Sequence, residues 1–217
     1  CPERIAQGKS LTELPKISQI ISGKNVKAKI ESGKIFKKIC KKIIYTKITE
    51  AELIKLFSNA YRYINFSISN QFYLICKNQG LDFFKIRNFM RNNYKRNTDI
   101  PMAGFTAGPC LLKDTMQLSS FCNHRFPLFH AAMSINESLP RFIINNLNEK
   151  YNLKKKIVGV LGLSFKAEND DIRDSLSIKL LKELKSKKIK TLQSDEYYKD
   201  KKSVDKNVLI KKSDIII

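Results

Sequence analysis

The sequence predicts a mixed α/β protein with an all-helical middle, and two patterns carry that prediction. Apolar residues recur at helical spacing between Leu53 and Ile75, as they do along the buried face of a long helix. A continuous apolar run at 157–162 ends in glycine and precedes a loop and a second helical pattern. This is the order of a buried parallel strand, its connection and its crossover helix. We therefore expect one long core helix in a helical domain, followed by a Rossmann-like C-terminal domain.

The first 48 residues contain two short predicted strands. Residues 17–21 are apolar and end at a Ser-Gly pair, and residues 42–45 form a second short apolar run. We expect residues 1–48 to be the end of a preceding α/β domain.

The long helix is predicted over residues 49–79. Thr49 with Glu52 three positions later has the pattern of a capping box, which marks a helix start. The periodic apolar stripe ends at Gln79-Gly80. Lys55 and Asn59 lie one turn apart beside this stripe, where they are either a solvated pair or a donor pair for an oxyanion.

The rest of the helical middle follows in order. Residues 81–91 and 129–148 have helical spacing, while residues 97–107 have no periodicity and are predicted to be a loop that leads to a helix near Leu111. The two histidines, His124 and His130, are six positions apart with a proline between them, so we interpret both as structural.

Three consecutive lysines at 154–156 mark the expected boundary of the C-terminal domain. After the strand at 157–162 we expect a helix at 176–187 and strands at 189–192 and 208–217. The predicted domains are therefore residues 1–48, 49–150 and 151–217.

Composition restricts the class of protein. The chain has 217 residues with 42% hydrophobic residues, which is enough for globular domains. Its formal net charge of +21 raises the possibility of nucleic-acid binding. The lysines are scattered without aromatic interleaving, so we interpret them as solvated faces or as a field that attracts an anionic small molecule, and we expect no nucleic-acid partner.

The cysteines indicate a reducing compartment. Five cysteines and two histidines have no disulfide or metal-site spacing, so we expect no metal and a cytoplasmic protein. No apolar run reaches membrane-spanning length, and no membrane association is expected. The chain begins with Cys1 and ends in an apolar β-branched run, and we interpret it as an internal piece of a longer protein.

The segment from Gly104 to Asp114 is the strongest candidate for a catalytic site. Its glycines allow the backbone to approach a ligand, and Lys113 offers positive charge that favours a thiolate on Cys110. Asp114 would share a helix face with Cys110 if a helix begins there. This combination fits covalent catalysis, whereas the ordinary alternative is a cysteine that only fills space.

Four motifs in the same order resemble the UDP-glucose/GDP-mannose dehydrogenase family. They are residues 2–8 (PERIAQG), Lys55 with Asn59, residues 104–114, and residues 162–175 (GLSFKAENDDIRDS). The resemblance covers nearly the whole chain. It implies NAD-dependent oxidation of C6 of a nucleotide sugar to the uronate, for polysaccharide precursor synthesis, and a homodimer formed through the long helix.

The resemblance also implies residue roles. Cys110 resembles the nucleophile, Lys55 and Asn59 the oxyanion donors, and Asp114 the carboxylate that activates water. The residues similar to those that hold the nucleotide sugar are Glu3, Arg96, Gly104, Phe105, Phe165 and Lys166. Gln7, Lys113 and Arg173 resemble residues on the NAD side.

The sequence departs from the family pattern in three places. Gln7 stands where many members have a glutamate, and the cysteine loop is one residue longer than the commoner form, more like enzymes acting on UDP-N-acetylamino sugars. The glycine-rich NAD loop with which members begin is absent from the 217 residues. We therefore expect this chain to be inactive by itself.

Two other functions remain open at this point. A non-catalytic module that binds a nucleotide sugar or serves assembly is favoured by Gln7, but it would need no nucleophile at Cys110. A nucleic-acid-binding protein is supported by charge alone and would show steeply salt-dependent binding.

Overall fold

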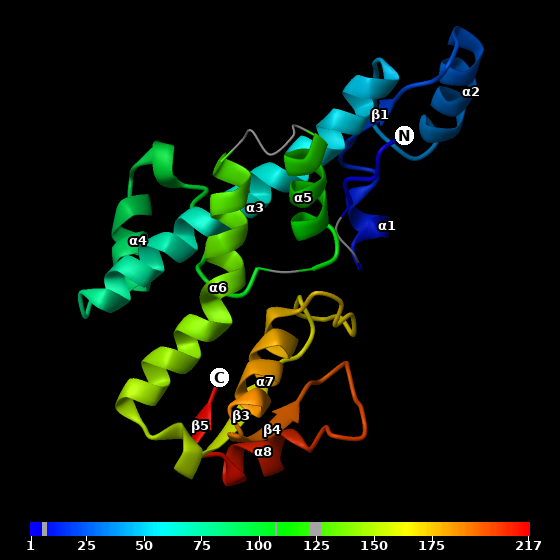
Figure 1. The fold of residues 1–217 in the computed structure, drawn as a ribbon. Helices are drawn as coiled ribbons and strands as arrows, with labels where there is room; N and C mark the ends of the chain where they lie inside the picture. The colour runs from blue at the N-terminus through cyan, green and yellow to red at the C-terminus, as the bar shows by residue number, and fades with distance from the viewer. Residues whose placement is uncertain (6–7, 107, 122–126) are drawn as a thin grey trace. The chain divides into compact units, whose positions relative to one another are not determined.

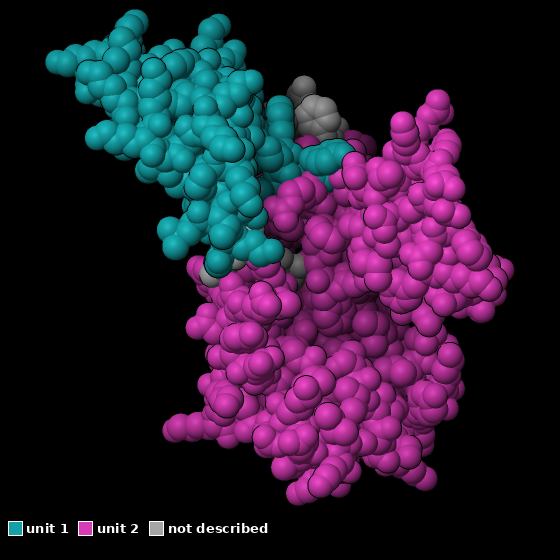
Figure 2. Space-filling view, turned by 180° about the vertical axis from the view of Figure 1, so that it is seen from behind, with its two compact units in different colours: residues 1–61 teal, residues 62–217 magenta. Residues whose placement is uncertain are grey.

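The computed structural model describes residues 1–5, 8–106, 108–121 and 127–217. The chain divides into two compact units, residues 1–61 and residues 62–217 (Figure 2), and each unit is described by itself. The division into domains at residues 48 and 150 stays a prediction.

Unit 1 contains a parallel pair of strands connected by a helix. Strands β1 (Ser18–Ile21) and β2 (Lys42–Tyr45) pair in register from Ser18 opposite Lys42, which confirms both predicted strands. A short helix α1 (Ser10–Glu13) precedes β1, and α2 (Val26–Phe36) connects the two strands. The side chain of Asn25 caps α2 by accepting a bond of 2.8 Å from the Ala28 amide.

The long helix α3 runs over Ile48–Asn78 and confirms the predicted core helix. Its predicted cap at Thr49 was wrong. The helix begins one residue earlier, and the carboxylate of Glu50, not Glu52, accepts from the Lys47 amide at 3.0 Å and from the Thr46 hydroxyl. Glu50 therefore has the reciprocal role of a capping box, because it lies three residues after Lys47, the residue that precedes the helix.

Three further α-helices complete the helical middle: α4 (Phe83–Arg91), α5 (Leu111–Phe121) and α6 (Pro127–Lys150). The 3-10 turn η1 (Lys95–Asn97) lies between α4 and α5. These elements confirm the helices expected near residues 81–91, 111 and 129–148. The ring of Tyr73 in α3 lies 6.4 Å from that of Phe83 and 6.5 Å from that of Phe142, so aromatic contacts connect α3 with α4 and α6.

The C-terminal part is a three-stranded parallel sheet with helices on both faces (Figure 1). After the turn η2 (Leu153–Lys155), strand β3 (Ile157–Leu161) lies between β4 (Lys190–Ser194) and β5 (Ile215–Ile216). Val158 and Val160 pack with leucines of α7 (Leu176–Ser186) and with Ile144 of α6. Gly159 approaches Leu209 of α8 (Lys206–Lys212) so closely that a Cβ added to the glycine would lie 2.7 Å from Leu209 Cδ2.

This arrangement confirms the Rossmann-like expectation, with one correction. Residues 208–217 are not one strand, because α8 occupies Lys206–Lys212 and only Ile215–Ile216 pair as β5. Asp205 caps α8 by accepting from the Asn207 amide, and Leu209 is buried while Val208 and Ile210 are exposed. An apolar run with one buried position suits a short helix on the sheet better than a strand.

Candidate active site

The candidate nucleophile lies at the start of a helix. Cys110 immediately precedes α5, and its carbonyl accepts the Asp114 amide at 2.9 Å. The Cys110 side chain is exposed, whereas Asp114 is buried in the first turn of the helix. A helix start presents unpaired N–H groups and a positive dipole end, an environment that stabilises a thiolate. Lys113, on the same turn, is exposed.

The loop that leads to Cys110 is held by side chains of α3. The amide of Asn70, which is fully buried, bonds both polar groups of the Gly104 backbone: Oδ1 accepts from the Gly104 amide at 2.8 Å, and Nδ2 donates to its carbonyl at 3.1 Å. Ser69 donates to the Pro101 carbonyl at 2.9 Å. These bonds fix the candidate substrate segment around Gly104 and Phe105.

A buried arginine of α4 holds the same loop a few residues earlier. The Arg87 guanidinium donates to the carbonyl oxygens of Ile100, at 2.6 Å from Nη2, and of Pro101, at 3.0 Å from Nε. Burial, together with the nearby Arg91, lowers the pKa of Arg87. Residues 98–106 form neither a helix nor a strand, which confirms the predicted loop over most of its length. Its backbone is held at the carbonyls of Ile100 and Pro101.

Gly108, two residues before Cys110, packs against Phe165 in the loop that follows β3. Its φ is +113°, and a Cβ there would lie 2.7 Å from Cδ2 of Phe165. Only glycine permits both this backbone conformation and this approach. The structure thus brings together the loops that contain the predicted residues Cys110 and Phe165.

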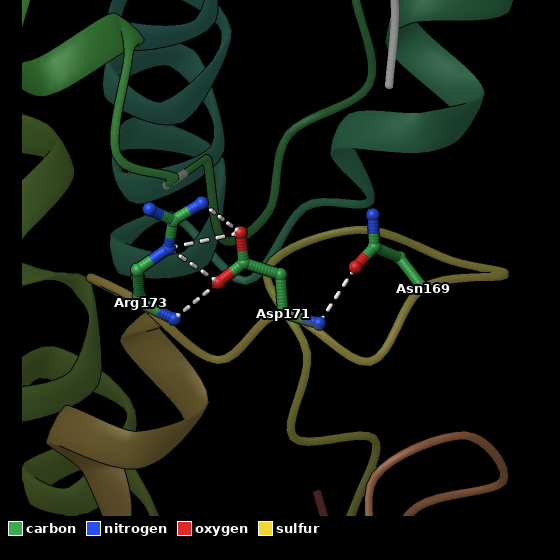
Figure 3. A network of polar contacts seen from close by, with 3 residues as sticks. All are labelled: Asn169, Asp171 and Arg173. Carbon is green, nitrogen blue, oxygen red and sulfur yellow. Dashed lines mark hydrogen bonds and ion pairs between the residues drawn. The ribbon is translucent and has the colours of Figure 1, made fainter. Parts of the chain in front are cut away.

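The loop after β3 is fixed by its own polar groups (Figure 3). Arg173 forms a bidentate ion pair with Asp171, in which Nη2 lies 2.6 Å from Oδ2 and Nε lies 3.0 Å from Oδ1. The Asp171 amide donates to Asn169 Oδ1, and its carbonyl accepts from the Phe165 amide. The hydrogen bond and charge of Asp171 raise the pKa of Arg173.

A crevice of about 850 Å³ lies at the carboxyl ends of β3 and β4, and Gly162, Lys166 and Asp195 are among the residues that line it. Ligands of open α/β sheets bind at this edge. Asp195 accepts from the backbone amides of Leu163, Ser164, Tyr197 and Tyr198. Its partial burial raises its pKa, but these four bonds outweigh burial and lower the pKa below the ordinary value.

The remaining predicted site residues belong to other elements or to unit 1. Glu3, Lys55 and Asn59 belong to unit 1, in which Glu3 is exposed, Lys55 half-buried and Asn59 buried. Arg96 is exposed in η1. Gln7, and with it the predicted contact to NAD, lies outside the described residues, as does His124. His130 in α6 lies 3.0 Å from the Ser119 hydroxyl of α5, which fits a structural role.

Asn70 is the residue that sequence reasoning missed. It was visible as an amide in a helix otherwise suited to burial, but nothing in the sequence identified the Gly104 backbone as its partner. In the part of the chain that the structure describes, no three His, Cys, Asp or Glu side chains are grouped as they would be around a metal ion. No helix among the described residues is both long enough and apolar enough to cross a membrane.

Comparison with known proteins identifies the family of the chain. Two family models match the chain: the central domain of the UDP-glucose/GDP-mannose dehydrogenase family over residues 49–138, and the UDP binding domain of the same family over residues 159–216. The two matched segments hold α3 to α5 and the three-stranded sheet, respectively.

Several curated relatives are dehydrogenases of nucleotide sugars. A UDP-N-acetyl-D-mannosamine dehydrogenase of Pyrococcus horikoshii is 32% identical over 186 residues, which are 83% of this chain and 44% of that protein. A UDP-glucose 6-dehydrogenase of Haloferax volcanii is 28% identical over 193 residues, 84% of this chain and 45% of that protein. The chain spans about half the length of the curated relatives that it matches.

Solved structures show the same fold. The UDP-D-ManNAc dehydrogenase of Pyrococcus horikoshii superimposes with a TM-score of 0.88 at 29% identity, over 99% of this chain and 52% of that one. A UDP-glucose dehydrogenase of Pyrobaculum islandicum superimposes with a TM-score of 0.86 at 23% identity, over 99% of this chain and 54% of that one. With family models covering more than half of its residues, the chain belongs to the UDP-glucose/GDP-mannose dehydrogenase family.

Proposed function

We propose that this chain is the catalytic and UDP-sugar-binding part of an NAD-dependent nucleotide-sugar 6-dehydrogenase. The observation that carries the proposal is the placement of Cys110, which is exposed at the start of α5, one turn before buried Asp114. A binding module would need no exposed cysteine between a glycine-rich loop and a helix N-terminus.

The proposed chemistry needs a nucleophile that holds an aldehyde through a second oxidation. After C6 is first oxidised from alcohol to aldehyde, the Cys110 sulfur adds to the aldehyde carbon, and the thiol proton passes to the carbonyl oxygen to give a thiohemiacetal. Loss of a hydride from C6 and of the hydroxyl proton gives a thioester. Water then adds at the thioester carbon, and the carbon–sulfur bond breaks to release the uronate and restore the thiol.

Three side chains have proposed roles around this carbon. Lys55 and Asn59 donate to the oxygen where negative charge develops, and Asp114 takes a proton from the attacking water. Asn59 is buried within unit 1 and Asp114 within unit 2, and in each unit burial holds the polar group in a fixed position, which supports these roles.

NAD is the cofactor that the family implies, and when bound it supplies the hydride acceptor for both oxidations. The chain's own candidates for contacting it are Lys113 and Arg173, two cations suited to a pyrophosphate. The bidentate pair with Asp171 fixes the orientation of the Arg173 guanidinium. These two residues, with Gln7, form the proposed NAD side of the site.

We propose a UDP-N-acetylamino sugar as the substrate, with UDP-glucose as the alternative. The match to the family's UDP binding domain supports the UDP part, and Lys166 in the crevice provides a cation for the diphosphate. The longer cysteine loop supports the acetylamino branch, as do relatives that are dehydrogenases of UDP-N-acetyl-D-mannosamine. Phe165, packed against Gly108, is the proposed contact for uridine.

A homodimer through α3 is a further proposal. Ile68 and Ile75 are seven residues apart on α3 and are 43% and 51% exposed, and Phe89 of α4 is 67% exposed. Residues seven apart lie close to one helix face, so these two isoleucines form a short apolar stripe that a partner helix could cover.

The test joins this chain to the N-terminal NAD-binding domain of a family member and measures NADH formed per UDP-sugar consumed. Two NADH per UDP-N-acetyl-D-mannosamine, with turnover lost in Cys110→Ser, would support the double oxidation and the nucleophile. UDP-glucose in a parallel reaction distinguishes the two substrate branches. Sugar-nucleotide binding without NADH would replace this proposal by a non-catalytic binding module.

A further inference from the structure

We infer that Asn70 and Asn136 are positioning residues for substrate: they set the backbone of the loop that receives the nucleotide sugar. This inference rests on the proposed function. Asn70 bonds the backbone of Gly104, and Asn136 bonds Asn70.

Asn70 bonds the backbone of Gly104 at two points. One amide group satisfies both the N–H and the C=O of a single residue, at 2.8 and 3.1 Å. Gly104 itself is exposed, so without Asn70 its polar groups can bond water, and the loop loses a fixed position. The two-point bond therefore acts on the position of the loop backbone.

Asn136 of α6 determines the orientation of the Asn70 amide. Asn70 Nδ2 also donates to Asn136 Oδ1 at 2.8 Å, and Asn136 Nδ2 donates to the Tyr63 carbonyl at 3.2 Å. All three residues are fully buried. Asn136 must present its oxygen to Asn70 because its nitrogen is engaged by a carbonyl, which in turn fixes the orientation of the Asn70 amide toward Gly104.

A second side chain of α3, that of Ser69, bonds the same loop. Ser69, also fully buried, donates to the Pro101 carbonyl at 2.9 Å. Its neighbour Ser67 is buried too, but it donates to Ile64, a carbonyl of its own helix, at 2.7 Å. The two serines have the same chemistry and similar burial and differ in whether they reach the loop. They therefore form a matched pair for separating loop position from general stability.

The experiment measures the dissociation constant of UDP-N-acetyl-D-mannosamine for the full 217-residue chain by calorimetry, with unfolding in urea as the control for stability. We expect Asn70→Leu to weaken binding about tenfold, the loss of roughly one net hydrogen bond. Ser69→Ala should weaken binding about threefold, and Ser67→Ala should leave it unchanged. Hydrogen exchange should rise at residues 101–106 in Asn70→Leu and not in α5.

Each outcome decides the matter. If Ser67→Ala and Ser69→Ala weakened binding equally, or if Asn70→Leu left binding unchanged, the positioning role would be overturned. The proposed function would still stand. If Asn70→Leu does not fold, the serine pair decides by itself. Absence of any binding by the wild-type chain would overturn the proposed function and, with it, this inference.

Discussion

The side-chain amide of Asn70 bonds the backbone of Gly104 at both its N–H and its C=O. This pairing connects the long helix α3 to the loop that ends at Cys110. It fixes the backbone at Gly104, six residues before the candidate nucleophile, and a preorganised backbone is what a catalytic site requires.

Gly104→Ala should disturb this pairing through backbone strain. The φ of Gly104 is +154°, and a Cβ there would meet no atom within 4 Å, so the cost is conformational and not steric. We expect a loss of about 1 kcal/mol in the free energy of unfolding, together with weaker binding of UDP-N-acetyl-D-mannosamine.

Gly80→Ala is the matched control for Gly104. Gly80 also has a positive φ, +67°, and open space around it, but it follows the end of α3, far from the loop in sequence. Both variants should lose stability in urea unfolding, and only Gly104→Ala should lose affinity. Equal affinities for the two variants would refute a role of the Gly104 conformation in ligand binding.

Gly108→Ala should lower the free energy of unfolding by more than backbone strain alone would. Its Cβ would lie 2.7 Å from Phe165 Cδ2, so the ring must move away from the cysteine loop. Gly162 has a similar φ of +98° with nothing within 4 Å, and Gly162→Ala supplies the comparison. We expect Gly108→Ala to cost on the order of 1 kcal/mol more than Gly162→Ala in urea unfolding. Equal losses would mean that Phe165 does not pack on Gly108.

The cap of α3 gives a test of helix register. Glu50 accepts from Thr46 and Lys47, and these bonds lower its pKa, that from Thr46 most. Glu50→Gln should therefore lower the thermal unfolding temperature at pH 7. Glu52→Gln, the position that the capping pattern in the sequence suggested, should leave it unchanged. The reverse result would restore the cap at Thr49.

Stability should fall in acid through Asp195. Its folded-state pKa is lowered, so its contribution is present above the unfolded-state pKa, about 3.9, and is lost as the pH falls through the lower folded value. Asp195→Asn should be less stable than wild type at pH 7, because an NH₂ group would face backbone amides. The difference between the two proteins should shrink below about pH 4.

Glu196→Gln, a change at the exposed neighbouring position, is the control for Asp195. Urea unfolding from pH 7 to pH 3 should give it a profile parallel to that of wild type. A constant difference between wild type and Asp195→Asn over the whole range would contradict the role of the Asp195 charge.

The sequence predicted the regular elements where hydrophobic pattern decides structure. The run at 157–161 became the central strand because Val158 and Val160 face α7 while Gly159 leaves room for Leu209. The same reasoning failed at Val208, Leu209 and Ile210, where three consecutive apolar residues form a helix with only Leu209 buried. Tertiary packing and the Asp205 cap override β-branched propensity there.

The sequence could predict only those site residues that lie close together along the chain. Cys110 and Asp114 are four residues apart, so a helix start places them on adjacent turns, as expected. Asn70 and Gly104 are 34 residues apart, and no period in the sequence indicates that an amide on α3 will meet one peptide of the loop. Such pairings depend on how the helices pack.

Cys110 reactivity tests the central claim most directly. The full chain is treated with iodoacetamide, with and without UDP-N-acetyl-D-mannosamine, and alkylation of each cysteine is followed by peptide mass spectrometry. Cys1, also exposed, is the internal reference, and buried Cys76 reports unfolding of α3. We expect Cys110 to be alkylated faster than Cys1 and the nucleotide sugar to slow the alkylation of Cys110 alone. Equal rates for Cys110 and Cys1, unaffected by the sugar, would contradict the assignment of Cys110 as nucleophile.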